Sequence, residues 1–177
     1  MNEVGPWPHR LVWKDLENGI ASLNLVADAD ILSRVALFLD LEAVTTLRAD
    51  LAVRPWLDGI EIAGRIEAVV TRVCGVTLDA FDTTIVDDLS VRLVPHGSPN
   101  AAHGEGTDFT IDLDAEDPPE ELVGDTVDIG AYVVEHLALA LDPFPRKPGA
   151  VFEPPESIGP ESPFAGLVRL KSAPLPD

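Results

Sequence analysis

The clearest chemical feature of the chain is the stretch VVEHLALALDPFPRKPG, in which Glu135 stands beside His136. A carboxylate next to an imidazole suggests an acid and a base, or half of a metal site. The apolar spacing of the stretch is helical, and neighbours on a helix diverge by roughly 100° around its axis. A zinc-protease arrangement needs a second histidine four residues away, where Tyr132 and Ala140 stand. We predict that the pair is not a hydrolytic site and that His136 is partly buried at the edge of an apolar stripe.

Other metal-ligating residue types occur at His96, His103 and Glu105. Their surroundings, rich in Gly, Pro, Ser and Asn, predict a flexible loop over residues 96–107. The spacing matches no established ligand pattern, and a floppy loop does not preorganise ligands. Cys74 is the single cysteine, and its register on an apolar strand face predicts a buried, inert thiol. The sequence therefore predicts no catalytic residue, no metal, no cofactor and no small-molecule substrate, and hence no enzyme.

Charge narrows the range of partners. The chain has 31 acidic and 12 basic residues, a formal net charge of -19. Such a field repels phosphate at long range and attracts basic partners. No apolar run reaches the roughly 20 residues of a membrane span, and the N-terminal stretch lacks a signal-peptide core. We expect a cytoplasmic protein without a membrane partner.

The densest acidic segment runs from Asp108 to Asp128, with nine acidic residues and no basic one. Within it, FTIDLD alternates as a short strand does, and AEDPPEEL is typical of an acidic loop. A solubilising surface and a docking strip for a basic protein both fit the pattern. The acids that we select as candidate partner-binding residues are Asp114, Glu116, Asp117 and Glu120.

The elements around these residues follow from apolar periodicity. Alternation predicts strands in residues 10–13, 20–26, 41–53, 60–74 and 83–95. Four-residue spacing predicts a helix after Asp28 or Asp30, and a second helix begins at Asp128 and ends before Pro143. One apolar and one mixed face per strand indicates an antiparallel meander covered on one side. We predict an α+β fold, mainly an antiparallel β-sheet with a few packed helices, in a single domain over residues 1–177.

The predicted faces of the meander carry different side chains. The apolar face of the strand over 41–53 is predicted to comprise Leu41, Ala43, Leu47, Ala49, Leu51 and Val53. The opposite face of the meander carries both signs of charge. An RNA-facing arginine array and a solvated face with cross-strand charge pairs are the two interpretations, and the matching number of acids favours the second. The charged residues are Arg48, Arg54, Arg65, Arg92, Glu42, Asp50, Glu61, Glu67 and Asp88.

The C-terminal part holds further candidates. Arg146 and Lys147 follow the second helix, where they complement the helix dipole or contact phosphate. The stretch SPFAGLVRLK begins as a capped helix with Phe164 and Leu167 on one face. Such a short helix is marginal alone in water, so we expect residues 150–177 to be a docking segment, on the chain's own core or on a partner.

Three blocks of the sequence resemble one known family. VDIGAYVVEHLALALDPFPRKPGA resembles the most characteristic block of the YceD family, also called DUF177. ESPFAGLVRLK is similar to that family's C-terminal signature, and VVTRVCGVTLDAF to its central strand. The resemblance covers about residues 10–171, and DPFPRKPGA looks most like alphaproteobacterial members. Many relatives have a second cysteine where Thr71 stands here, so two-cysteine chemistry is not expected.

The resemblance implies a function. It implies a non-enzymatic ribosome biogenesis factor that supports accumulation of 23S ribosomal RNA and assembly of the large ribosomal subunit. The alternative is an acidic adaptor or holding protein for a basic ribosomal protein, without direct RNA contact. Expected partners are a basic ribosomal or assembly protein and large-subunit rRNA, the latter in direct or indirect contact.

Overall fold

The computed structural model describes residues 5–16, 19–101 and 118–153. In this part of the chain two α-helices and seven strands form, together with one turn of 3-10 helix. The elements are β1 (Arg10–Val12), the 3-10 turn (Trp13–Leu16), β2 (Ala21–Val26), α1 (Ala29–Phe38), β3 (Ala43–Trp56), β4 (Gly59–Val73), β5 (Ala80–Pro95), β6 (Glu120–Leu122), β7 (Thr126–Asp128) and α2 (Ile129–Ala140).

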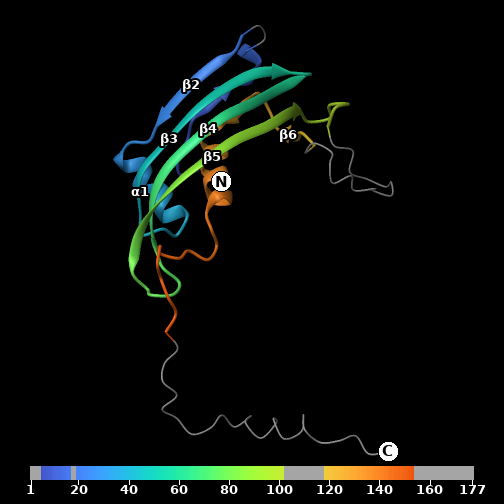
Figure 1. Cartoon of the computed structure of the whole chain (residues 1–177). Helices are drawn as coiled ribbons and strands as arrows, with labels where there is room; N and C mark the ends of the chain where they lie inside the picture. Colours follow the sequence, from blue (N-terminus) through green and yellow to red (C-terminus); the bar gives the residue numbers. More distant parts are fainter. Residues whose placement is uncertain (1–4, 17–18, 102–117, 154–177) are drawn as a thin grey trace, which may run out of the picture.

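The main sheet is an antiparallel meander with one parallel addition. Its order is β2-β3-β4-β5-β6, and β6 runs parallel to the last residues of β5. A separate two-stranded sheet pairs β1 with β7. The long strands curve together, and α2 lies on the concave side of the sheet (Figure 1). The predicted α+β class with a meander is confirmed.

The core lies between this concave face and the helices. Alternate residues of β4 are buried, among them Ile60, Ile62 and Ile66, as the sequence predicts. The alternate set of β5 is buried as well, including Leu89 and Leu93. Helix α2 adds Ile129, Val133 and Leu137, each without exposed surface. Burial of each large side chain stabilises the fold by roughly 1.5–3 kcal/mol.

One strand departs from the predicted alternation. The pairing of β3 with β4 shifts between Val44 and Thr46, so Thr45 is the extra residue of a β-bulge. The bulge turns Val44 into the core, with an exposed fraction of 6%, while Ala43 is only half-buried. The prediction that Ala43 shares the buried face with Leu47 was therefore wrong in part, because strict alternation fails across a bulge.

Both predicted helices form with the predicted N-caps. The Asp28 carboxylate accepts a hydrogen bond from the Ile31 backbone N–H at 2.9 Å. Asp128 accepts from the Ala131 N–H at 3.4 Å and also from the N–H of His9 at 2.9 Å. The second cap thus ties the start of α2 to the segment before β1. Among the described residues, neither helix has the length and apolar character that crossing a bilayer requires.

Candidate partner-binding surface

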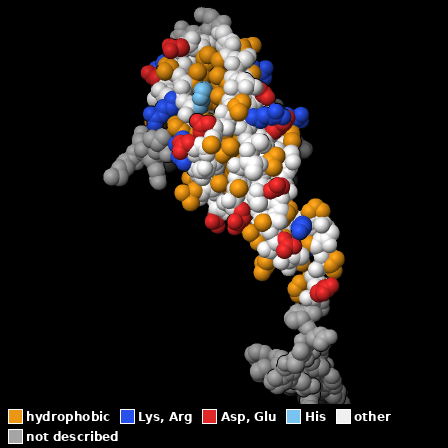
Figure 2. Space-filling view, turned by 90° about the vertical axis from the view of Figure 1, so that its left-hand side faces the viewer, with side chains coloured by type: hydrophobic (Ala, Val, Ile, Leu, Met, Phe, Trp, Pro, Cys, Tyr) orange, Lys and Arg blue, Asp and Glu red, His pale blue; other side chains and the backbone are white. Residues whose placement is uncertain are grey.

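The convex face of the sheet carries the predicted mixed charges in cross-strand pairs. Strand register places Arg48 opposite Glu67, and Arg65 opposite Asp88. The side chains follow the register: Arg48 binds the Glu67 carboxylate, and Arg65 Nε lies 3.2 Å from Asp88 Oδ1. Figure 2 shows basic and acidic side chains interspersed over one side of the molecule. These contacts support the solvated face with charge pairs.

Glu61 forms ion pairs with two arginines of this face. Its side chain is 5% exposed, and it lies between Arg54 on β3 and Arg92 on β5. Arg54 binds one carboxylate oxygen, and Arg92 Nε lies 3.2 Å from the other. The Arg92 guanidinium also stacks over the Trp56 ring, 5.1 Å from its centroid. A buried carboxylate without partners would destabilise the fold. The ion pairs with Glu61 therefore hold both arginines against the sheet.

The acidic segment is described only in its second half. Asp114, Glu116 and Asp117 lie outside the described residues, as do the predicted strand FTIDLD, His103 and Glu105. The prediction of a loop over AEDPPEEL was wrong at its end, because Glu120–Leu122 forms β6. This strand pairs with Leu93–Pro95, so its partner and not its own sequence makes it a strand.

Glu120 lines a shallow cleft of about 410 Å³ between β6, β7 and α2. Glu121, Asp128 and Glu135 contribute further carboxylates to its lining. Tyr132 donates a hydrogen bond from its hydroxyl to Glu120 Oε2 at 3.0 Å. Burial, together with the charges of Glu120 and Glu135, raises the pKa of Tyr132, so the phenol remains a donor at neutral pH. The cleft is a polar, negatively charged surface that suits a lysine or arginine side chain.

The start of the predicted flexible loop is hydrogen-bonded in place. The Asn100 amide donates to Asp58 Oδ1 at 2.9 Å, and the Asn100 backbone N–H donates to Ser98 Oγ at the same distance. The hydrogen bonds from Ser98 and Asn100 lower the pKa of Asp58. His96 contacts the Glu121 carboxylate, so this end of the loop lies against β6. The rest of the loop lies outside the described residues.

The basic pair lies at the other end of β5. Arg146 and Lys147 are exposed in the segment after α2. The ammonium of Lys147 lies 3.2 Å from Asp79 Oδ2, in the turn that precedes β5. The carbonyl of Asp142 after α2 accepts a hydrogen bond from Arg72 instead. Since Glu120 pairs with β5 near its end, the structure does not bring the predicted acidic and basic sites together. Phe164 and Leu167 lie outside the described residues.

Cys74 is buried, as predicted, but not on an apolar strand face. Because β4 ends at Val73, the sulfur lies in the following turn and accepts the backbone N–H groups of Val76, Thr77 and Lys147 at 3.3–3.4 Å. The side chain of Thr77 and these N–H groups lower the pKa of Cys74 to about 6. The prediction of an apolar environment was wrong. The sulfur instead holds the turn to the segment after α2.

Glu135 and His136 occupy the predicted places on α2. Glu135 is exposed and His136 is half-buried. Within residues 5–16, 19–101 and 118–153, no three histidine, cysteine or carboxylate side chains gather as they would around a metal ion.

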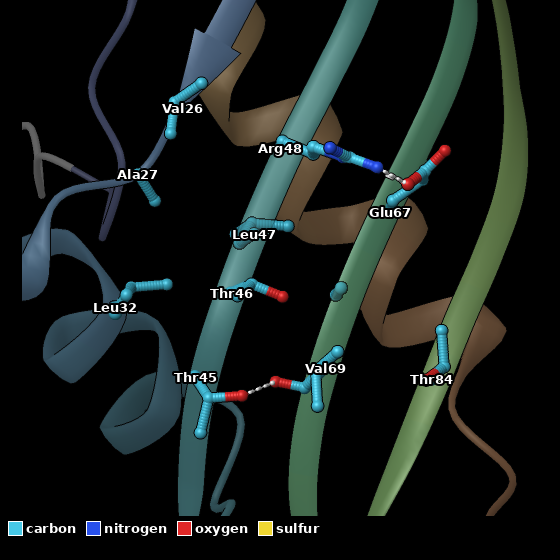
Figure 3. Close-up of a pocket in the computed structure, with 11 residues that line it drawn as sticks. Val26, Ala27, Leu32, Thr45, Thr46, Leu47, Arg48, Glu67, Val69 and Thr84 are labelled. Atoms are coloured by element: carbon cyan, nitrogen blue, oxygen red, sulfur yellow. Dashed lines mark hydrogen bonds and ion pairs between the residues drawn. The ribbon is translucent and has the colours of Figure 1, made fainter.

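A second cavity, of about 560 Å³, opens on the convex face near α1. Figure 3 shows Leu32 on one side of it and the strands β3 and β4 on the other, with the Arg48–Glu67 pair along its wall. The bulge residue Thr45 donates its hydroxyl to the Val69 carbonyl at 3.2 Å. The lining of this cavity is mostly apolar and hydroxyl-bearing, and the Arg48–Glu67 ion pair is its charged part. Such a lining suits binding of a protein surface, and these residues do not form a general acid–base pair.

Sequence reasoning missed three features of this surface. The burial of Glu61 and the pairing of its two arginines required the strand register. The tyrosine-lined cleft required the packing of β6 against α2. The edge of β5 that has no strand beside it among the described residues required the sheet order.

Comparison with known proteins identifies the family. The family model described as "Large ribosomal RNA subunit accumulation protein YceD" matches residues 62–171. No curated protein and no solved structure matched the chain. The matched region runs from β4 through α2 and includes Glu120, Arg146 and Lys147. The chain therefore belongs to the YceD family of large ribosomal RNA subunit accumulation proteins.

Proposed function

We propose that this protein is a non-enzymatic cytoplasmic factor that supports 23S rRNA accumulation and large-subunit assembly by holding a basic ribosomal or assembly protein. In this proposal it reaches pre-ribosomal RNA through that protein. The family description supports the role in rRNA accumulation.

One observation supports protein over RNA as the direct contact. The four convex-face arginines each lie against a carboxylate, and the carboxylate of Glu61 serves two of them. The carboxylate beside each arginine cancels much of its attraction for phosphate, so this face as a whole attracts RNA weakly. The net charge of -19 opposes approach to RNA in addition.

The acidic side chains around β6 fit the proposed partner. Glu120, Glu121 and Glu135 line the cleft and have exposed side chains. Asp114, Glu116 and Asp117 precede them in sequence, so the same stretch of chain concentrates negative charge. Opposite potentials speed association and set specificity more than they set affinity.

The alternative is direct contact with rRNA. Arg146 favours it, since it is exposed and the described contacts give it no acidic partner, and Lys147 stands next to it. This contact would involve two basic side chains only, and the net charge of -19 would still repel the RNA.

Affinity purification from cells, with and without nuclease, tests the proposal. A basic large-subunit protein should remain bound after nuclease treatment. Neutralising the acidic segment should reduce recovery of this basic protein, and the complex should then depend less on salt. The substitutions are Asp114→Asn, Glu116→Gln, Asp117→Asn and Glu120→Gln. A charge-matched control, Asp15→Asn, Asp30→Asn, Glu42→Gln and Glu153→Gln, should leave recovery unchanged. Loss of all partners on nuclease treatment would contradict the proposal.

A further inference from the structure

The longest open edge in the described part of the sheet belongs to β5. On one side β5 pairs with β4 from Ala80 to Leu93. On its other side β6 pairs only with Leu93–Pro95. From Ala80 to Val91 the outer edge therefore has no strand beside it among the described residues. At about 3.3 Å per residue this edge is roughly 40 Å long, and a row of backbone N–H and C=O groups points outward along it.

Natural edge strands usually carry features that prevent pairing. Lysine, proline, a bulge or a short length are common devices. Between Ala80 and Val91 there is no lysine and no proline, and the register with β4 continues without a shift. The edge is therefore regular enough to receive another strand.

The charge of the β5 edge indicates which kind of added strand it would bind. The same stretch holds Asp82, Asp87 and Asp88, and no basic residue. Asp82 and Asp88 are exposed, Asp87 is half-exposed, and Val86 has an exposed fraction of 51%. Opposite charges on neighbouring strands attract across the pair, and like charges repel. Asp82 and Asp88 lie on the convex face of the sheet, and Asp87 lies on the opposite face. A strand with lysine or arginine at every second position therefore meets Asp82 and Asp88, and the exposed contact of Asp88 with Arg65 opposes this by only about 0–1 kcal/mol.

Other occupants fit less well. A second copy would place the same three aspartates against this edge, between two chains that each carry -19. The chain's own stretch FTIDLD would bring Asp112 and Asp114, so it meets the same repulsion. The opposite edge strand, β2, has the sequence ASLNLV and offers no charge to recognise a basic partner.

We propose that the outer edge of β5, from Ala80 to Val91, binds an extended basic segment of a protein partner as an added β-strand. This inference rests on the proposed function, because the segment belongs to the basic protein held during assembly. Backbone hydrogen bonds supply affinity in such strand addition, and alternate side chains supply specificity. The added strand lies in line with β6 along the same edge of the sheet.

Amide hydrogen exchange in the full chain tests the proposal residue by residue. The probe is a synthetic peptide in which lysine alternates with threonine or valine. Alternate amides between Ala80 and Val91 should exchange rapidly in the free protein and become protected on peptide addition. A peptide N-methylated at every second residue keeps the charge but loses the donors of one edge, so it should bind weakly and give no protection. A peptide with glutamate for lysine should not bind.

Variants of the protein distinguish binding at the β5 edge from a general effect of its negative net charge. Asp82→Asn and Asp88→Asn together should weaken peptide binding roughly fivefold at low salt, from two lost cross-strand pairs on the convex face. The control Asp15→Asn with Glu42→Gln removes equal charge elsewhere and should have a much smaller effect. Circular dichroism establishes that both sets fold.

Several outcomes would overturn the proposal. Protection of these amides in the dilute free protein would show that another segment of the same chain already pairs with this edge. Protection that grows with protein concentration, with a doubled mass, would assign it to a second copy. Peptide binding with protection elsewhere, or equal protection by single-stranded RNA, would also reject it. Nuclease-resistant recovery of a basic protein without β5 protection would leave the proposed function standing and remove this inference alone.

Discussion

Replacing Glu61 with glutamine tests whether the convex-face arginines are held by carboxylates. The substitution keeps the shape of the side chain and a carbonyl acceptor while it removes the charge between Arg54 and Arg92. Breaking a fully buried ion pair costs about 3–5 kcal/mol, and an exposed pair contributes about 0–1 kcal/mol. Glu61 is 5% exposed, but its partners are 57% and 28% exposed. We expect a loss of about 2 kcal/mol in the free energy of unfolding.

The matched control is Asp88→Asn on the same face. Its pair with Arg65 has side chains 59% and 78% exposed, so the loss should stay below about 0.5 kcal/mol. In thermal unfolding, about 2 kcal/mol corresponds to a fall in Tm of roughly 4–8 °C for a chain of this size. A Tm for Glu61→Gln that matches that of Asp88→Asn would show that the buried Glu61 charge stabilises the fold no more than an exposed ion pair does.

The same variant has a second readout. If Glu61 holds Arg54, removing its charge makes Arg54 available to phosphate. Weak RNA binding should then strengthen, with a salt slope steeper by about 0.7–0.9, from one new phosphate contact. An unchanged slope would mean that Arg54 was available to RNA from the start.

Three further predictions concern single sites. Gly130→Ala should lower the Tm even though alanine favours helices by about 1 kcal/mol, because its Cβ would lie 1.8 Å from the Trp7 carbonyl oxygen; a higher Tm would show that this contact is absent. Leu137→Ala should cost about 2–5 kcal/mol in urea unfolding, since the side chain is wholly buried; a loss under about 1 kcal/mol would contradict its place in the core. For Cys74, the lowered pKa of about 6 favours the thiolate in the folded state. Its stabilising effect is therefore complete above the unfolded pKa near 9.0 and is lost as pH falls through about 6. The Tm of the native chain should therefore exceed that of Cys74→Ser by a margin that grows as pH rises from about 6 to about 9. A margin that stays constant over this range would count against a stabilised thiolate.

Much of the fold was predictable because long strands repeat their pattern. The alternate apolar residues of β4 and β5 identify the buried face, and Asp28 and Asp128 mark the helix starts. Thr45 was not predictable as a bulge, since its neighbours on both sides have β-forming side chains. The three residues of β6 follow two prolines and carry two glutamates, so only their pairing with β5 makes them a strand.

The candidate site was predictable in its charge and not in its geometry. The sequence indicates that arginines and acids share one face of the meander. It does not indicate that Glu61 serves two arginines, because this depends on the register of three strands. Likewise, one of the three N–H groups that the Cys74 sulfur accepts comes from Lys147, far away in sequence.

We propose that this protein reaches the large subunit through a protein and not through its own contact with RNA. The most direct measurement is the affinity of the purified protein for naked large-subunit rRNA as a function of salt. We expect weak binding at physiological salt with a shallow slope, on the order of 1–2, because few basic side chains in the part of the chain that the structure describes are available to phosphate. Tight binding with a steep slope, unaffected by neutralising the acidic strip and lost on Arg146→Ala with Lys147→Ala, would contradict it.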